Sequence, residues 1–244
     1  MGMLLITGTT SGVGLSVARH VSQRMPVLAL ARDIEKCRRL FAGNDAVTCE
    51  QVDLADAARL PEIITRLLAR YEPVSHLINN AGMNARAETA DLTEARLHEF
   101  MQVNAIAPWL ITRAVLPGMR ERDFGRIINI TSGAPLNCFP GYSAYSASKG
   151  ALNALTVTMA REHQNCNIRI NLMSPGPVRS NMAPDAPMDP SVCHPTVDYL
   201  LDLPANGPTG RFFWLGYEIP LFPDLAGVHW LEGKADAGIR RVLP

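Results

Sequence analysis

Tyr145 and Lys149 are the residue types best suited to acid–base chemistry in this sequence, and they lie four positions apart. Residues at this spacing share one face of a helix, and the surrounding segment 143–164 has a helical pattern. A free tyrosine has a pKa of about 10, and a fixed ammonium beside it favours the phenolate and lowers that value. The chain has five tyrosines and three lysines, so chance seldom produces this spacing. We therefore predict a proton donor tuned toward neutral pH, with an inert pair on an exposed helix face as the alternative.

Ser132 and Asn104 are two further candidates. Ser132 follows an apolar strand, residues 126–131, and precedes Tyr145 by thirteen positions. The carboxyl end of a strand opens onto the crevice where parallel sheets bind ligands, so this hydroxyl could donate to a substrate oxygen that gains negative charge. Asn104 lies inside a long helical segment, where asparagine is a mediocre helix former. It could bind a water and relay protons, although for an isolated asparagine a structural role is favoured.

A glycine-rich turn connects the first strand to a helix that begins near Val13. Such a turn points backbone N–H groups and the positive end of a helix dipole at one spot, which suits a pyrophosphate. Gly8 permits the tight turn, Gly12 lets a phosphate approach the backbone, and Gly14 lets the helix contact the sheet. The candidate phosphate-binding residues are Gly8, Thr10, Ser11, Gly12, Val13 and Gly14. No Lys-Ser or Lys-Thr follows, which excludes a nucleotide-hydrolysing P-loop; a turn that only connects two elements stays open.

The end of the second strand bears on the choice of cofactor. At this point of a dinucleotide-binding sheet an acidic side chain favours a free ribose 2′-hydroxyl, and a basic one favours a 2′-phosphate. Ala31 stands at the usual acidic position and Arg32 follows it, so we predict NADP(H) in preference to NAD(H). Asp33 could still serve a ribose hydroxyl. Asp53 closes the third strand, where its carboxylate either accepts from an adenine amine or caps the next helix.

Short apolar runs alternate with helical segments over most of the chain. The predicted strands are 4–7, 27–31, 46–52, 76–79, 126–131 and 169–173, and the predicted helices are 13–24, 34–41, 57–70, 94–122 and 143–164. Strands that are apolar throughout and separated by helices indicate a parallel sheet buried on both faces. The sequence therefore predicts an α/β fold of the Rossmann type, a doubly wound parallel sheet in three layers.

Composition excludes several other classes of protein. The chain has 244 residues, 47% hydrophobic and 19% charged, which is typical of a folded globular protein. Its 23 basic residues balance 23 acidic ones, which argues against nucleic acid as a partner. There is no apolar run of membrane-spanning length and no secretory signal pattern, so we expect a cytoplasmic protein without a membrane partner. The five cysteines form no CxxC pair and the histidines are dispersed, so no metal site is predicted.

Taken together, these residues resemble the short-chain dehydrogenase/reductase family. The matching pieces follow the family's order over about residues 3–180. They are the turn 7–14, Asp53, the run 79–82, Asn104, Ser132, Tyr145 with Lys149, and the run 175–180. Single pieces are weak signals, whereas eight in register form a strong one. The resemblance implies an oxidoreductase that transfers a hydride between NAD(P)H and a small-molecule carbonyl or secondary alcohol.

The resemblance also implies a role for each site residue. Tyr145 would protonate the forming alkoxide, or accept the proton in oxidation, while Lys149 would lower its pKa and bind the nicotinamide ribose. Ser132 would orient the carbonyl, and Asn104 would hold a water in the proton relay. The remaining implied cofactor contacts are Asp53, Leu54, Asn80, Ala81, Gly82, Pro175, Gly176, Val178 and Ser180. Members of this family are commonly dimers or tetramers, so we expect a homodimer or homotetramer.

The last part of the chain departs from the alternating pattern. Residues 181–210 carry six prolines, four aspartates and no Lys, Arg or Glu, which predicts a loop with at most a short helix, corresponding to the family's substrate lid. These aspartates suggest a neutral or cationic substrate unless they simply face water. We place no domain boundary in 1–244 and expect an irregular tail over 211–244. An epimerase or dehydratase on the same scaffold, or a nucleotide-sensing protein without turnover, remains an alternative function.

Overall fold

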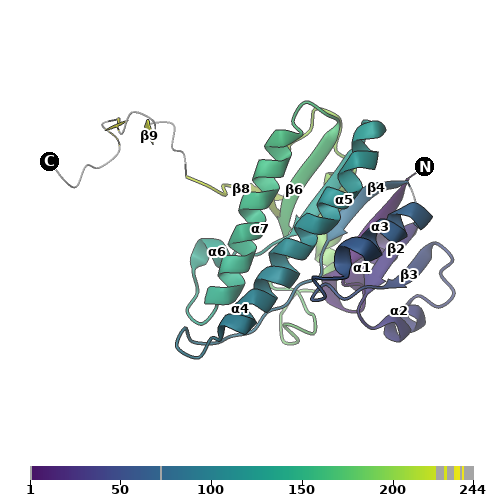
Figure 1. The fold of residues 1–244 in the computed structure, drawn as a ribbon, viewed down its shortest axis with the longest axis horizontal. Helices are drawn as coiled ribbons and strands as arrows, with labels where there is room; N and C mark the ends of the chain where they lie inside the picture. The colour runs from purple at the N-terminus through teal and green to yellow at the C-terminus, as the bar shows by residue number, and fades with distance from the viewer. Residues whose placement is uncertain (1, 72, 224–227, 230–233, 237, 239–244) are drawn as a thin grey trace.

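The core of the protein is a mostly parallel sheet of eight strands. The computed structural model describes residues 2–71, 73–223, 228–229, 234–236 and 238 (Figure 1). The strands are β1 (Met3–Thr7), β2 (Val27–Ala31), β3 (Val47–Gln51), β4 (Val74–Asn79), β5 (Gly125–Ile130), β6 (Ile168–Ser174), β7 (Phe212–Trp214) and β8 (Tyr217–Ile219). Two short strands, β9 (Val228–His229) and β10 (Lys234–Ala235), pair with each other. The order in the sheet is β3-β2-β1-β4-β5-β6-β7-β8, and β8 alone in it runs antiparallel to its neighbour.

This strand order creates the crevice that a ligand needs. The chain moves outward from β1 to β3 and then crosses back to β4, which pairs with β1 on its other side. In open α/β sheets, ligands bind outside the carboxyl ends of the strands at the point where the direction of winding reverses. The residues that follow β1, β4, β5 and β6 therefore share one edge of the sheet, as the sequence predicted for the fold class.

Helices cover both faces of the sheet. They are α1 (Gly12–Val21), α2 (Ile34–Leu40), α3 (Leu60–Tyr71), α4 (Glu94–Met101), the π-helix η1 (Gln102–Ile106), α5 (Ala107–Glu121), α6 (Ala134–Asn137), α7 (Ser143–Glu162), the 3-10 helix η2 (Pro190–Cys193) and α8 (His194–Leu201). In the described ranges, none of them combines the length and the apolarity of a membrane span.

Two large hydrophobic cores, and a small cluster of Leu152, Leu172 and Phe212, hold the three layers together. One core joins α1, α2 and α8 to one face of the sheet, and Leu4 and Ile6 of β1 point into it. The other joins α3, α5 and α7 to the opposite face, and Leu5 of β1 points into that one. In Figure 1, α5 and α7 lie in front of the sheet. Because successive side chains of a strand point to opposite faces, a strand covered on both sides buries all its side chains, and β2, which is buried at every residue, is apolar throughout.

The predicted helical segment 94–122 is one continuous helical stretch whose geometry changes in the middle. Helix α4 passes through the π-turn η1 into α5, and Asn104 lies at the centre of that turn. π-turns inside helices occur often at functional sites. The sequence indicated an irregularity there through the poor helix propensity of asparagine, but not its form.

The end of the chain is more regular than predicted. The tail, expected to be irregular from residue 211, contributes β7 and β8 to the sheet. The approach to β7 is fixed by residues far away in the sequence. The Gly210 N–H donates to the Ile170 carbonyl at 2.8 Å, and the Arg211 N–H donates to Asn171 Oδ1 at 3.0 Å. Phe212 and Phe213 are then buried against the core. The rest of the predicted tail, residues 224–227, 230–233, 237 and 239–244, lies outside the described residues.

Candidate active site

Tyr145 and Ser132 meet at the carboxyl edge of the sheet. Ser132 follows β5, Tyr145 lies in the first turn of α7, and a hydrogen bond joins their side chains. Ser132 Oγ also accepts the Ala134 N–H at 3.1 Å. Burial raises the pKa of Tyr145 above its usual value, and the hydrogen bond to Ser132 offsets part of that rise. The phenol is therefore protonated at neutral pH and lies beside a second hydroxyl.

Lys149 lies one helical turn from Tyr145, but its ammonium turns toward the sheet. Nζ donates to the Ile130 carbonyl at 2.7 Å, and the residue is 4% exposed. Burial lowers the pKa of Lys149 to about 8. We predicted that Lys149 lowers the pKa of Tyr145; in this structure the pKa of Tyr145 is raised instead, and the influences on it are burial and Ser132. Desolvation is the largest influence on both groups, and the hydrogen bond of the ammonium goes to a carbonyl rather than to the phenol.

Asn104 connects the loop after β4 to α7. It is fully buried; its Oδ1 accepts the Met83 N–H at 2.9 Å, and its Nδ2 donates to the Met83 carbonyl at 2.9 Å and to Ser148 Oγ at 3.0 Å. Its amide is thus occupied by protein partners, which differs from the predicted water-binding role of this side chain. A Cβ atom at Gly82 would stand 3.1 Å from Asn104 Oδ1 and 3.5 Å from Lys149 Nζ. Gly82, Asn104 and Lys149 therefore lie side by side.

The glycine turn is fixed to the loop after β4 by a set of short hydrogen bonds. Thr7 Oγ1 accepts the N–H groups of Asn80 and Ala81 at 3.0 and 2.9 Å. Asn80 Nδ2 donates to the carbonyls of Thr7 and Gly8 at 2.9 and 3.1 Å. Gly8 has a φ of +73°, a left-handed conformation that favours glycine, and a Cβ atom there would stand 2.8 Å from Ala81 Cα. The structure thus brings together Gly8, Asn80 and Ala81, which lie far apart in the sequence.

The N-terminus of α1 fits a phosphate group. Ser11 is the N-cap residue, its side chain makes no capping hydrogen bond, and the first turn has no acidic residue. The N–H groups of a helix's first turn have no partners within the helix and attract an anion. Thr10 and Ser11 are partly exposed, whereas Val13 is buried in the core beneath them. A Cβ atom at Gly12 would stand 2.6 Å from Ser180 Cβ, so the loop after β6 reaches this turn.

Arg32 and Asp53 lie at the ends of the neighbouring strands β2 and β3. Arg32 is exposed, and within the described part of the chain its side chain has no ion-pair partner. Asp33 caps α2 by accepting the Lys36 N–H at 2.9 Å. Asp53 is exposed and accepts the Ala55 N–H at 3.0 Å, so its carboxylate closes a turn and does not cap α3, which begins later, at Leu60. Leu54 is buried next to it.

The segment 175–180 approaches the site from β6. Gly176 has a φ of +77°, and a Cβ atom there would stand 2.9 Å from Trp214 Nε1. Val178 is buried and forms an isolated bridge with Met188, which ties the segment to the following loop. Pro175 precedes this turn, and its carbonyl lies 3.7 Å from Cys193 Sγ. The sequence missed Trp214 as a neighbour of this loop, because β7 was not predicted.

Three of the four aspartates of the segment 181–210 form ion pairs, and Asp185 is exposed without an ion pair to another described residue. Asp189 pairs with Arg179 at 3.1 Å. Arg24 pairs with Asp198 at 3.2 Å and with Asp202 at 2.7 Å. The basic partners come from outside the segment, so its composition could not reveal them. Because Asp185 alone of the four keeps a carboxylate without an ion pair among the described residues, these aspartates give little support to a preference for a neutral or cationic substrate.

Comparison with known proteins identifies the family. A family model described as short chain dehydrogenase matches residues 3–190. The chain belongs to the short chain dehydrogenase family. It is 34% identical over 195 residues to a sepiapterin reductase of Chlorobaculum tepidum, covering 74% of this chain and 79% of that protein. It is 35% identical over 194 residues to a dehydrogenase/reductase SDR family protein 7-like of Drosophila melanogaster, covering 75% of this chain but only 59% of that longer protein.

Solved structures of short chain dehydrogenases share the fold. A 4-hydroxyisoleucine dehydrogenase complexed with NADH superposes with a TM-score of 0.81 at 26% identity, covering 88% of this chain and 97% of that one. A metagenomic short-chain oxidoreductase in complex with NADP gives a TM-score of 0.75 at 28% identity, covering 85% and 93%. The predicted family and Rossmann-type fold are confirmed. A nicotinamide cofactor is supported, since these structures hold either NADH or NADP.

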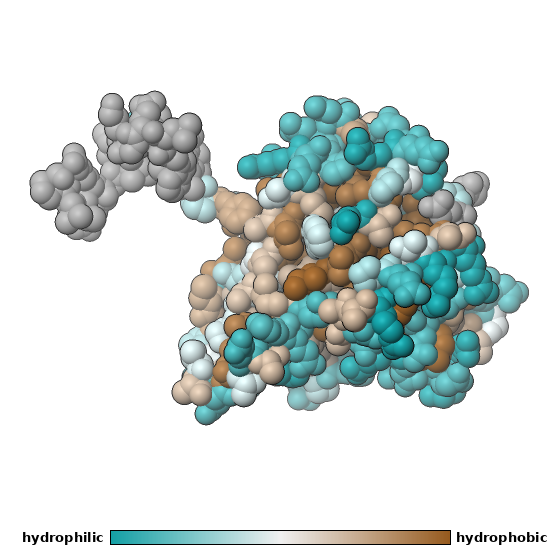
Figure 2. Space-filling view, viewed as in Figure 1, coloured by the Kyte–Doolittle hydropathy of each residue, from teal (hydrophilic) through white to brown (hydrophobic). Residues whose placement is uncertain are grey.

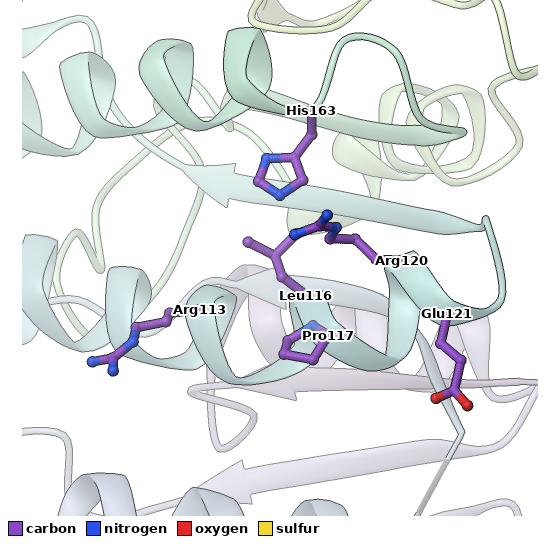
Figure 3. Close-up of a pocket in the computed structure, with 6 residues that line it drawn as sticks. All are labelled: Arg113, Leu116, Pro117, Arg120, Glu121 and His163. Atoms are coloured by element: carbon purple, nitrogen blue, oxygen red, sulfur yellow. The ribbon is translucent and has the colours of Figure 1, made fainter.

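Two surface pockets lie outside the Tyr145 site. One, of about 540 Å³, lies between the ends of α5 and α7 (Figure 3). It is lined by Arg113, Leu116, Pro117, Arg120, Glu121 and His163. Because α5 ends where the chain enters β5, this pocket lies at the sheet edge opposite to Ser132. The other, of about 760 Å³, lies between α1 and the segment 179–194 and includes Gly12 and Ser180, so it adjoins the glycine turn. In the described residues, no three His, Cys, Asp or Glu side chains converge as a metal site requires.

Proposed function

We propose that this short chain dehydrogenase is an NADP(H)-dependent oxidoreductase that interconverts a carbonyl and a secondary alcohol. The observation that carries the proposal is the hydrogen-bonded pair Ser132 and Tyr145, with Lys149 one turn away, at the same sheet edge as the uncapped N-terminus of α1. The pair could hold a carbonyl oxygen and exchange its proton, while the helix N-terminus suits a pyrophosphate. The cofactor, when bound, supplies or accepts the hydride.

In this proposal Tyr145 is the proton donor during reduction. Because burial raises its pKa, the phenol stays protonated at neutral pH and can donate its proton to the developing alkoxide. Ser132 orients the carbonyl by donating to the same oxygen. Oxidation of an alcohol requires the phenolate instead, so its rate should increase as pH rises above neutral, whereas the rate of reduction should not.

Lys149 and Asn104 have different parts in the proposed mechanism. Lys149 is charged below a pH of about 8 and would bind the ribose hydroxyls next to the nicotinamide. Asn104 acts as a positioning residue, because its amide holds the Met83 backbone and Ser148 in place. The cofactor would be held by the glycine turn 8–14, by the loop 80–82 and by Val178 and Ser180 of the loop after β6.

The preference for NADP(H) over NAD(H) rests on Arg32. Its guanidinium is exposed at the end of β2 and is not engaged by a carboxylate of the described residues, so it could grip a 2′-phosphate. Asp33, the residue that could have served a ribose hydroxyl, is engaged in capping α2. Since similar structures hold either NADH or NADP, the preference remains a proposal for this chain.

The wider organisation is also proposed. Residues 1–244 would form one nicotinamide-binding domain, in which 181–210 is the lid over a small carbonyl or alcohol substrate and 211–244 is the tail.

Figure 2 shows apolar side chains gathered over α5 and α7 and bordered by polar ones. Val103, Trp109 and Leu155 are partly buried apolar residues of η1, α5 and α7. An apolar patch of this kind supports self-association as a homodimer or homotetramer. A cytoplasmic location stays a prediction.

The test follows the absorbance of NADPH and of NADH with a panel of ketones and secondary alcohols. In Tyr145→Phe, kcat should fall by about 10²–10⁴-fold while cofactor affinity is nearly intact, because only the proton donor is lost. Tyr142→Phe is the matched control, because it removes a phenol hydroxyl from a neighbouring ring whose centroid lies 6.5 Å from that of Tyr145. This substitution should leave turnover unchanged. Undiminished activity of Tyr145→Phe would remove Tyr145 from its role. Product formation without net cofactor consumption would indicate an epimerase or dehydratase, and cofactor binding without any turnover a nucleotide sensor.

A further inference from the structure

Two cysteine thiols lie in contact beneath the glycine turn. The Sγ atoms of Cys37 and Cys49 are 3.0 Å apart, although the residues belong to different elements, α2 and β3. Cys37 is fully buried, whereas Cys49 is partly exposed and can be reached from solvent. The other three cysteines, at 138, 166 and 193, have no cysteine sulfur as a partner in the described part of the chain. The proposed reduction mechanism uses none of the five.

The elements that carry this pair can move by the small distance that a covalent bond needs. A disulfide has an S–S length of about 2.05 Å, so the two sulfurs need to approach by about 1 Å. Helix α2 has seven residues, and Cys37 is the one residue of it that is fully buried. Strand β3 is the edge strand of the sheet and pairs with β2 alone. Because α2 is short and β3 has a neighbouring strand on one side only, the disulfide can form without a rearrangement of the hydrophobic core.

Cys37 also contacts the glycine turn itself. Its Sγ lies 3.4 Å from Oγ1 of Thr9, a fully buried residue between Gly8 and Thr10. Disulfide formation removes the Cys37 S–H and shifts its sulfur, so the contact with the Thr9 hydroxyl changes. Loss of this hydrogen bond at the buried Thr9 hydroxyl would destabilise the turn's conformation. The thiol pair is thus coupled to the segment that should bind the pyrophosphate.

We propose that Cys37 and Cys49 form an oxidisable dithiol that a peroxide closes reversibly to a disulfide, and that closure weakens binding of the nicotinamide cofactor. The thiolate of the partly exposed Cys49 attacks hydrogen peroxide, the O–O bond breaks, and, once the leaving hydroxide has taken up a proton, a sulfenic acid and water have formed. The Cys37 sulfur then attacks the Cys49 sulfur, the S–O bond breaks, and water leaves with the Cys37 proton. Two thiols lose two hydrogens in total, and one peroxide is reduced to two waters. The effect on the cofactor, unlike the disulfide itself, rests on the proposed function.

Peptide mapping tests the disulfide without reference to activity. The full chain is treated with hydrogen peroxide, free thiols are alkylated, and the protein is digested without reductant for mass spectrometry. We expect a link between the peptides of Cys37 and Cys49, which dithiothreitol removes. Cys193→Ser, which deletes a buried thiol without a cysteine neighbour, should form the same link, and Cys49→Ser should form none. Sulfinic acid at Cys49 without a link, or links mainly to the other cysteines, would overturn the proposal.

The pH dependence of closure tests whether a thiolate with a raised pKa reacts with the peroxide. Burial, the Cys37 thiol and Glu50 raise the pKa of Cys49 to about 12, against a lowering influence of Arg38. Since the thiolate is the reactive form, closure should be slow at neutral pH and accelerate about tenfold per pH unit from roughly 7 to 9. A rate that does not change with pH would contradict attack by Cys49.

Titration of NADPH into reduced and oxidised protein tests the coupling to the cofactor. Oxidised wild type should bind NADPH several-fold more weakly than the reduced form, whereas Cys49→Ser treated in the same way should show no change. Equal affinities for the two wild-type forms would refute the coupling. If the reduced protein binds neither NADPH nor NADH, the proposed function fails and the coupling with it, while the linked peptides still decide whether the dithiol exists.

Discussion

Gly14 and Gly150 are both helical glycines, yet substitution by alanine should change the stability of the protein in opposite directions. Alanine in place of a helical glycine stabilises by about 0.5–1 kcal/mol when space allows. At Gly150 in α7, a Cβ atom would have Pro135 Cβ as its nearest neighbour, at an ordinary 3.7 Å. At Gly14 in α1, a Cβ atom would stand 2.2 Å from the Gly8 carbonyl oxygen and 2.3 Å from Asn80 Nδ2. Neither contact can persist, so α1 or the turn must shift.

The size of the Gly14→Ala effect follows from these contacts. Overpacking costs about 1–3 kcal/mol, and displacement of Asn80 loses hydrogen bonds worth about 1 kcal/mol each. The gain in helix propensity offsets about 1 kcal/mol. With both Asn80 Nδ2 hydrogen bonds lost, the net loss is therefore about 2–4 kcal/mol, whereas Gly150→Ala should gain up to about 1 kcal/mol. For a chain of this size each kcal/mol shifts the melting temperature by roughly 2–4 °C.

Urea unfolding and thermal melts of the two variants beside the wild type measure this difference. Gly14→Ala should also bind the nicotinamide cofactor more weakly, because the shifted residues form the phosphate-binding turn. If Gly14→Ala melts at the same temperature as Gly150→Ala or above it, the close packing of α1 against the Gly8 carbonyl is wrong. The same outcome would mean that steric crowding does not require glycine at position 14.

Two further predictions concern buried polar groups. Asn104→Ala removes three hydrogen bonds, to the Met83 N–H, the Met83 carbonyl and the Ser148 hydroxyl, so the free energy of unfolding in urea should fall by on the order of 3 kcal/mol. Asn137→Ala, at an exposed site, is the control and should change the free energy of unfolding by less than about 0.5 kcal/mol. Burial lowers the pKa of His76 from 6.5 to about 4, so as pH falls the unfolded chain binds a proton before the folded chain does. The free energy of unfolding of the wild type should therefore drop by on the order of 3 kcal/mol between about pH 6.5 and pH 4. His76→Gln should lack this part of the pH dependence.

The strands and the meeting of Ser132 with Tyr145 were predictable because they follow from local signals. A strand buried on both faces is rich in apolar residues, so β2 is visible as a continuous apolar run, and β4 and β5 are visible as shorter runs interrupted by buried polar residues such as His76 and Arg126. Parallel strands place their carboxyl ends at one edge, which brings the residue after β5 near the beginning of α7. The strands and this meeting can therefore be inferred without knowledge of contacts between distant side chains.

Contacts between distant polar side chains were not predictable in this way. In the sequence Thr7 is only the last residue of the first strand, but in the structure its hydroxyl fixes the loop after β4. Ser148 stands between Tyr145 and Lys149 without any pattern that indicates Asn104 as its partner. Strand β7 is three residues long, and its approach is fixed by Asn171 and Ile170 of β6 rather than by its own composition. Such short, long-range pairings leave no periodic signal.

The error in the direction of the Tyr145 pKa has the same origin. Spacing shows that Lys149 is near Tyr145, but the protonation of either group depends on how much water each one loses, which spacing does not reveal. Lys149 is nearly inaccessible and gives its hydrogen bond to Ile130, so desolvation acts on both groups. In the proposed mechanism a protonated phenol is the form that reduction requires, so under that proposal the raised pKa favours reduction at neutral pH and makes oxidation the reaction that gains from alkaline conditions.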